Sequence, residues 1–199
     1  MNVLLVGGGG REHALAWKFT HDDPSVTLIA APGNPGIAEL ADCVPIPATD
    51  IERLLSLAQE RRVDLVVVGP EAPLAAGIVD RFREAGIPIF GPTRDAARIE
   101  TSKAFAKDLM VAAGVPTARA QVYTDATLAK SAARVFGAPV VIKASGLAAG
   151  KGVIVCETLE QADTAIDSML VGNAFGESGH EVLVEEFMTG EEVSVLALT

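Results

Sequence analysis

The sequence predicts an α/β protein in which a doubly wound, mostly parallel sheet domain precedes a smaller α+β module. Short apolar runs alternate with helical patterns over the first 90 residues, and several of these runs end in loops rich in glycine and proline. After Gly91 the order of the patterns changes. The 199 residues are 49% hydrophobic, 21% charged and only 5% aromatic, with 19 glycines, which is typical of an aliphatic globular protein.

The first module begins with an apolar run at residues 2–6 that ends in four glycines and is followed by a helical pattern through Trp17. Further strands are expected at residues 26–30, 43–46, 64–69 and 87–90, and helices at 50–61 and 75–85. Five strands alternating with helices indicate a doubly wound sheet, and such sheets bind ligands beyond the carboxyl ends of their strands. The loops GGGG, PGNPG and GPEAPL are expected at those ends.

The second module begins with a helix expected at residues 101–113, which GVP at residues 114–116 ends. The pattern strand, helix, strand, strand, helix, strand then follows, at residues 118–123, 125–136, 139–143, 152–156, 159–170 and 181–186. Residues 191–199 show another strand pattern with no turn or cap after it. We therefore expect a chain that ends within an element.

Charge and cysteine content limit the classes of partner. Lys and Arg number 16 and Asp and Glu 26, so the net charge is −10 and a binder of nucleic-acid phosphates is disfavoured. Cys43 and Cys156 lie in apolar runs without CxxC spacing, which predicts buried free thiols in a reducing compartment. Neither a signal-peptide pattern nor an uninterrupted membrane-length apolar run is present, so we expect a cytoplasmic protein with neither nucleic-acid nor membrane partners.

The four glycines at residues 7–10 stand between a strand and a helix, where backbone N–H groups can hold an anion. A dinucleotide-binding loop is one hypothesis. His13 occupies the third position of that fingerprint, however, and no acidic residue stands near residue 30 to hold a ribose. A tight turn without a ligand remains an alternative.

A second glycine loop, KASGLAAGKGV at residues 143–153, differs from a P-loop because Ser145 and Gly152 replace its first glycine and its magnesium-binding hydroxyl residue. The loop joins two extended apolar runs, which predicts a hairpin able to fold over phosphates. Lys143 ends an apolar strand, where burying an amine is costly without an anion, so we expect a ligand phosphate as its partner. Alternatively, Lys143 extends into solvent from an edge strand. Glu185 and Glu192, taken alone, are typical of a solvated acidic surface.

Six motifs taken together resemble the ATP-grasp ligases, and among them the phosphoribosylamine–glycine ligase (glycinamide ribonucleotide synthetase) family. They are GGGGREHALAW, PGNPG, GPEAPL, SKAFAKDLM, VIKASGLAAGKGV and EEFMTGEEVSV, in this order along nearly the whole chain. The resemblance implies a substrate-binding domain at residues 1–100 and a small nucleotide-gripping ATP-grasp subdomain at 118–189. Residues 101–117 and 190–199 would begin a central ATP-grasp domain.

The resemblance also implies an activity in purine biosynthesis. ATP would convert glycine to glycyl phosphate, and the amine of 5-phosphoribosylamine would attack it to give glycinamide ribonucleotide, ADP and phosphate. Family members use Mg²⁺ or Mn²⁺ and are about twice as long, so we expect the metal ligands to lie beyond Thr199. We expect this chain to be a truncated monomer with weak or no activity alone. Two alternatives remain: another ATP-grasp carboxylate–amine ligase, and a non-catalytic nucleotide-binding module.

Site residues carried over from the resemblance form two groups. Lys103 and Lys143 would grip the α and β phosphates under the glycine loop, Glu185 and the backbone of the next residues would bind adenine, and Glu192 would bind the ribose. The nucleotide-binding set is Lys103, Lys143, Ser145, Gly146, Gly150, Lys151, Gly152, Glu185, Glu186, Met188 and Glu192. The set for phosphoribosylamine, with Arg11 and loop N–H groups suited to its phosphate, is Gly8, Gly9, Gly10, Arg11, Glu12, Pro32, Gly33, Asn34, Pro35, Gly36, Glu71 and Pro73. No acid–base catalytic residue is expected.

Overall fold

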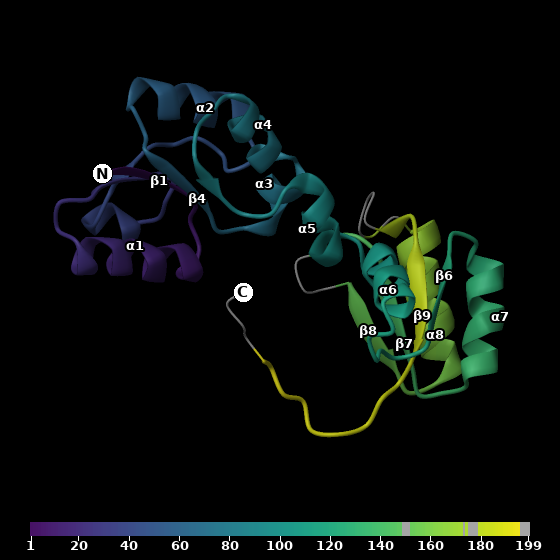
Figure 1. Ribbon diagram of the computed structural model, residues 1–199. Helices are drawn as coiled ribbons and strands as arrows, with labels where there is room; N and C mark the ends of the chain where they lie inside the picture. Colours follow the sequence, from purple (N-terminus) through teal and green to yellow (C-terminus); the bar gives the residue numbers. More distant parts are fainter. Residues whose placement is uncertain (149–151, 173, 175–178, 196–199) are drawn as a thin grey trace. The chain divides into compact units, whose positions relative to one another are not determined.

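The computed structural model describes residues 1–148, 152–172, 174 and 179–195 (Figure 1). It consists of two compact units, Met1–Thr101 and Ser102–Thr199.

The first unit is built on a sheet of five parallel strands in the order β3-β2-β1-β4-β5. Its strands are β1 (Asn2–Gly7), β2 (Thr27–Pro32), β3 (Asp42–Cys43), β4 (Leu65–Val68) and β5 (Ile89–Phe90). The order reverses at β1, so β2 and β4 lie on either side of it and the crevice between the carboxyl ends of β1 and β4 is a topological switch point. The predicted doubly wound parallel sheet is confirmed.

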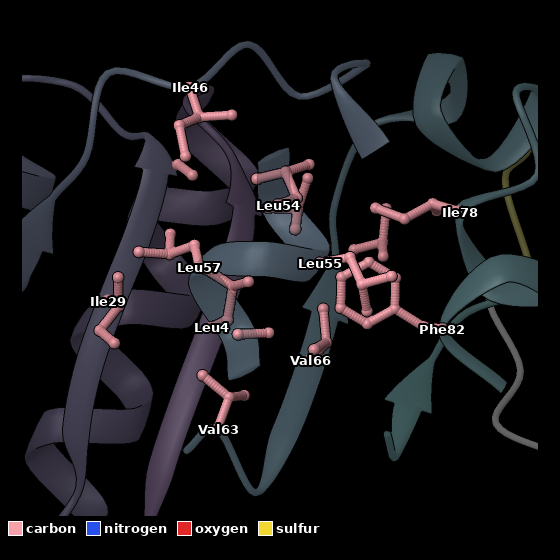
Figure 2. Packing of buried hydrophobic residues seen from close by; sticks show 14 of the residues in the cluster. Leu4, Ile29, Ile46, Leu54, Leu55, Leu57, Val63, Val66, Ile78 and Phe82 are labelled. Atoms are coloured by element: carbon pink, nitrogen blue, oxygen red, sulfur yellow. The ribbon is translucent and has the colours of Figure 1, made fainter. Parts of the chain in front are cut away.

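Helices cover both faces of this sheet because alternate residues of each strand point to opposite sides. Val3 and Leu5 of β1 pack against α1 and the short 3-10 helix η1, whereas Leu4 packs with Leu54 and Phe82 of α2 and α4. Figure 2 shows this second cluster. The elements that cover the sheet are α1 (Gly10–Asp22), η1 (Ile37–Glu39), α2 (Ile51–Glu60), α3 (Glu71–Ala75) and α4 (Ile78–Glu84). Helix α5 (Arg94–Thr101) contacts α3 and α4.

Two predicted helices begin later than expected. The helix expected at residues 75–85 is α4, which begins after Gly77, whose φ of +89° favours glycine. The short helix α3 instead forms mostly within GPEAPL, where a loop was expected. The helix expected at residues 101–113 begins two residues later as α6 (Lys103–Ala112), because the Ser102 hydroxyl caps it by accepting from the Phe105 N–H at 3.3 Å. Helix α5, just before it, was not predicted.

The second unit is an antiparallel sheet in the order β6-β9-β7-β8. Its elements are β6 (Ala120–Tyr123), α7 (Ala126–Phe136), β7 (Val140–Ala144), β8 (Val153–Cys156), α8 (Leu159–Ile166), a π-helical turn η2 (Asp167–Val171) and β9 (Val182–Glu186). The predicted order of strands and helices and the β7–β8 hairpin are confirmed. Strand β7 is an inner strand, so Lys143 does not lie on an edge strand.

Helices α7 and α8 cover one face of this sheet (Figure 1). Ile142 and Val184 point into that core with Ala129 and Ala165 of the two helices. The alternate positions of β7 and β9 therefore place Lys143 and Glu185 on the opposite face, which α6 reaches.

The strand expected at residues 191–199 is wrong for residues 191–195, which form no regular element, and residues 196–199 lie outside the described part of the chain. Both cysteines are free. Cys156 is buried as predicted, and burial raises the pKa of its thiol, whereas Cys43 is only partly buried. Within the described residues, no helix combines the length and apolar character needed to cross a membrane.

Candidate functional site

Glu12 lies at the switch point of the first unit, in the first turn of α1. Its side chain is 3% exposed, and its Oε2 accepts from the Gly9 N–H at 2.6 Å. The carboxylate therefore caps the helix, and the partial positive charge of the helix N-terminus stabilises its negative charge. Its Oε1 is buried and has no hydrogen-bond partner among the described residues.

Three glycines surround the Glu12 side chain because a larger residue would occupy its space. A Cβ at Gly7 would lie 2.8 Å from Glu12 Cγ, one at Gly9 would lie 2.9 Å from Oε2, and one at Gly69 would overlap Oε1. Gly7 also has a φ of +128°, which L side chains rarely adopt. The glycines of GGGG and GPEAPL thus enclose one buried carboxylate where β1 and β4 end.

The PGNPG loop joins the same corner from the end of β2. The Gly33 N–H donates to the Gly7 carbonyl at 3.1 Å, and the Asn34 amide donates to the Gly8 carbonyl at 2.9 Å. Asn34 Oδ1 in turn accepts from the Ile37 N–H at the start of η1. Residues that are 26 positions apart in the sequence are therefore held together through backbone carbonyls, as expected at the carboxyl edge of a parallel sheet.

Arg11 and Glu71 form an exposed ion pair above this corner, with Nη2 and Oε1 2.8 Å apart. The hydrogen bond from Arg11 and its charge lower the pKa of the Glu71 carboxyl. Pro73 is buried in the first turn of α3, where proline is tolerated. The structure thus brings GGGG, PGNPG and GPEAPL together, but one predicted anion donor, the Gly9 N–H, already bonds Glu12, and Arg11 already pairs with Glu71.

In the second unit, Glu185 forms the centre of a buried charged cluster. Its side chain is 8% exposed. Oε1 accepts from Lys143 Nζ at 2.5 Å, and Oε2 lies 3.1 Å from Lys107 Nζ. Lys143 therefore has a protein partner, which was not expected from the sequence, and its contact with a ligand phosphate stays a prediction.

Lys107 was missed by the sequence reading, although it stands one helical turn after Lys103 and on the same side of α6. Its ammonium also donates to Thr117 Oγ1 at 2.6 Å and to the Ala118 carbonyl at 2.9 Å. A lysine in an amphipathic helix such as SKAFAKDLM usually points to solvent. The only signal in the sequence is the i, i+4 spacing, which places Lys107 on the same side of the helix as Lys103.

Lys103 lies where the N-terminus of α6 meets the residues after β7. Its backbone N–H donates to the Ser145 carbonyl at 2.8 Å and its Nζ to the Gly146 carbonyl at 3.0 Å, while Ser145 Oγ accepts from the Ala104 N–H. Gly152 stands just before β8, and its carbonyl accepts from the Ala144 N–H. Gly150 and Lys151, the other predicted loop residues, lie outside the described residues.

The predicted adenine and ribose residues are less closely grouped. Glu186 ends β9 and its carboxylate accepts from both the backbone N–H and Nε of Arg119, each at 2.7 Å. Met188 follows the strand and is 65% exposed. Glu192 is exposed and forms no hydrogen bond or ion pair with this cluster within the described ranges.

The cluster between α6 and the sheet carries two ammonium groups and one carboxylate, and therefore a net charge of +1. Lys143 is the more exposed of its two lysines, with 26% of its side chain accessible against 10% for Lys107. A partly accessible excess positive charge favours an anion such as a phosphate. The described residues contain no group of three His, Cys, Asp or Glu side chains that could bind a metal ion.

Comparison with known proteins gives matches along the whole chain. Residues 1–100 match the family "Phosphoribosylglycinamide synthetase, N domain", and residues 101–199 match "Phosphoribosylglycinamide synthetase, ATP-grasp (A) domain". A phosphoribosylamine–glycine ligase of Xylella fastidiosa (strain 9a5c) is 54% identical over all of this chain and 46% of its own length. The chain thus spans about half the length of such curated relatives.

Solved structures show the same fold. The phosphoribosylamine–glycine ligase of Thermotoga maritima matches with a TM-score of 0.81 and 29% identity, over 96% of this chain and 45% of that one. The biotin carboxylase domain of the Hydrogenobacter thermophilus 2-oxoglutarate carboxylase matches with a TM-score of 0.75 and 23% identity, over 94% and 44%. The predicted fold class, including the ATP-grasp subdomain, is confirmed. The chain belongs to the phosphoribosylglycinamide synthetase family.

Proposed function

We propose that this chain supplies the phosphoribosylamine-binding and nucleotide-binding parts of a ligase that joins glycine to 5-phosphoribosylamine. The observation that carries the proposal is the net positive cluster of Lys143, Glu185 and Lys107 beside the β7–β8 hairpin, in a chain whose close relatives bear that ligase's name. A positive cluster that is partly accessible at Lys143 suits the phosphates of ATP.

The proposed reaction needs activation because a carboxylate is a poor electrophile. A glycine carboxylate oxygen attacks the γ-phosphorus of ATP, which releases ADP and gives glycyl phosphate. The amine nitrogen of phosphoribosylamine then bonds to the carbonyl carbon, phosphate leaves with the former carboxylate oxygen, and the nitrogen loses a proton. Positioning and charge neutralisation are what the protein must contribute to such a transfer.

In the second unit, Lys103 and Lys143 would hold phosphates while the loop around Ser145 and Gly146 covers them. Lys143 would exchange Glu185 for a phosphate oxygen, which its partial exposure permits. Glu185 and the backbone of Glu186 and Met188 would bind adenine, and the exposed Glu192 would bind the ribose. The remaining nucleotide contacts would come from Gly150, Lys151 and Gly152.

In the first unit, the corner where GGGG, PGNPG and GPEAPL meet would hold phosphoribosylamine. Arg11 would release Glu71 to bind the phosphate, since their ion pair is exposed and therefore weak. Exposed pairs are worth about 0–1 kcal/mol, less than a bidentate arginine–phosphate contact returns.

Magnesium or manganese would accompany ATP in the proposed enzyme. The described residues do not fit a metal ion by themselves, so no step here is assigned to one. We propose a cytoplasmic location, which the two free thiols support because reducing compartments keep cysteines unpaired. We also propose that the protein is a monomer.

ADP release tests the proposal. The chain is incubated with ATP, Mg²⁺, ¹⁸O-labelled glycine and phosphoribosylamine formed in the assay, and each substrate is omitted in turn. The proposal predicts that ATP raises the melting temperature and that any ADP release, however slow, requires both co-substrates and places ¹⁸O in the phosphate. ADP release that ignores glycine, or no effect of ATP on melting, would contradict it.

A further inference from the structure

Lys107 has an environment that fits neither a surface lysine nor a ligand-binding one. Its side chain is 10% exposed, and its ammonium contacts Thr117 Oγ1, the Ala118 carbonyl and Glu185 Oε2. Two hydrogen bonds and an ion pair with Glu185 therefore hold this ammonium in place. Lys107 is mostly occupied by protein partners and is less accessible to a ligand than Lys143.

Lys143 differs from Lys107 in each of these respects. Its side chain is more exposed, and Glu185 is its one hydrogen-bond partner within the described residues. Binding a phosphate would draw Lys143 away from Glu185. Without a second cation, that movement would leave a buried carboxylate unpaired, which is strongly unfavourable.

We propose that Lys107 is a positioning residue for nucleotide binding: it is the permanent counter-ion of Glu185 that lets Lys143 leave for a phosphate. This rests on the proposed function. Glu185 keeps one charged partner whether or not the site is filled, so its carboxylate is not left without a counter-ion as Lys143 moves. Lys107 also leaves the cluster with the net charge of +1 that attracts the anion.

The role makes a prediction that depends on the ligand's charge. When Lys107 is replaced by methionine, Lys143 becomes the sole counter-ion of a buried carboxylate and the cluster becomes neutral. ATP binding must then break the only ion pair that Glu185 has in this variant. Adenosine has no phosphate, so its binding does not require Lys143 to leave Glu185. ATP binding should therefore weaken and adenosine binding should not.

The experiment measures ATP affinity by calorimetry, and adenosine affinity by competition, for wild type, Lys107→Met and Lys107→Arg. We expect Lys107→Met to weaken ATP binding about tenfold or more while adenosine changes less than about twofold, and Lys107→Arg to recover most of the loss because the charge is kept. Because both affinities come from one sample, partial unfolding lowers them together. It therefore cannot imitate the selective loss.

Repeating the Lys107→Met substitution in the Glu185→Gln variant controls for poor folding of Lys107→Met. In Glu185→Gln the buried carboxylate charge is gone, so adding Lys107→Met should weaken ATP binding much less than Lys107→Met does in wild type, the remaining loss reflecting only the lost positive charge. Equal losses for ATP and adenosine, or an unchanged ATP affinity in Lys107→Met, would overturn the inference while leaving the proposed function standing. A wild-type chain that does not bind ATP would overturn both.

Discussion

Replacing Gly69 by alanine tests whether the Glu12 carboxylate organises the glycine corner of the first unit. The added Cβ would overlap Oε1 and lie 2.5 Å from Cδ and 2.6 Å from Cγ of Glu12. Glu12 has no room to move aside freely, because it is 3% exposed and its Oε2 is bonded to the Gly9 N–H. The substitution must therefore displace either the carboxylate or the end of β4.

The size of the effect follows from the two outcomes. Overpacking a buried site destabilises by about 1–3 kcal/mol. If Glu12 is expelled instead, the unit loses a helix cap worth about 0.5–2 kcal/mol. Either way we expect a loss of about 2 kcal/mol, which lowers the melting temperature of a unit of this size by roughly 8 °C.

Urea and thermal unfolding followed by fluorescence would measure the effect, because Trp17 is the one tryptophan of the chain and lies in this unit. Gly10→Ala is the matched control, since a Cβ there meets nothing within 4 Å. Glu12→Ala combined with Gly69→Ala should show a favourable coupling of about 1 kcal/mol, because the clash partner is gone. An unchanged midpoint for Gly69→Ala, or purely additive variants, would refute this account of the corner.

Two further predictions concern titratable groups in the second unit. The backbone N–H and side chain of Arg119 lower the pKa of the Glu186 carboxyl from its usual 4.5, so its stabilising effect is present above that pH and lost as the pH falls through the lowered value. Glu186→Gln should therefore flatten the fall in melting temperature below about pH 4.5, measured by thermal unfolding. Cys156 is buried with a raised pKa, so in native chain at pH 8 iodoacetamide should alkylate it at least about tenfold more slowly than the partly exposed Cys43, as counted by mass spectrometry.

Each of these has a contradicting outcome. If Glu186→Gln melts with the same acid dependence as wild type, the Arg119 contacts do not stabilise the ionised carboxyl in solution. If Cys156 and Cys43 react at equal rates, the core between the second sheet and its helices opens far more readily than its packing indicates.

Much of the fold could be predicted because local patterns and tertiary packing agree. The buried strand at DLVVVG, the capped helix α2 and the β7–β8 hairpin appear where periodicity and turn residues place them. Helix boundaries were less predictable. Helices α4 and α6 begin two or three residues later than the patterns predict, because each start depends on a single residue, the left-handed Gly77 and the capping Ser102.

The candidate site was only partly predictable for a different reason. Motifs identified Glu12, Lys143 and Glu185, but not what each of them contacts. The overlap of Gly69 with Glu12 and the second lysine on Glu185 arise from residues that are 57 and 78 positions apart in the sequence, and no spacing rule connects such pairs.

Calorimetric titration of ATP into wild type, Lys143→Met and Lys130→Met tests the central claim most directly. Lys130 is a matched control: its side chain is also 26% exposed and also pairs with one carboxylate, that of Asp167, but it lies on α7. If the second unit binds nucleotide phosphate through its positive cluster, Lys143→Met should weaken ATP binding about tenfold or more, a typical loss for a charged hydrogen-bond partner, while Lys130→Met binds like wild type. Equal ATP affinity in all three proteins would contradict the claim.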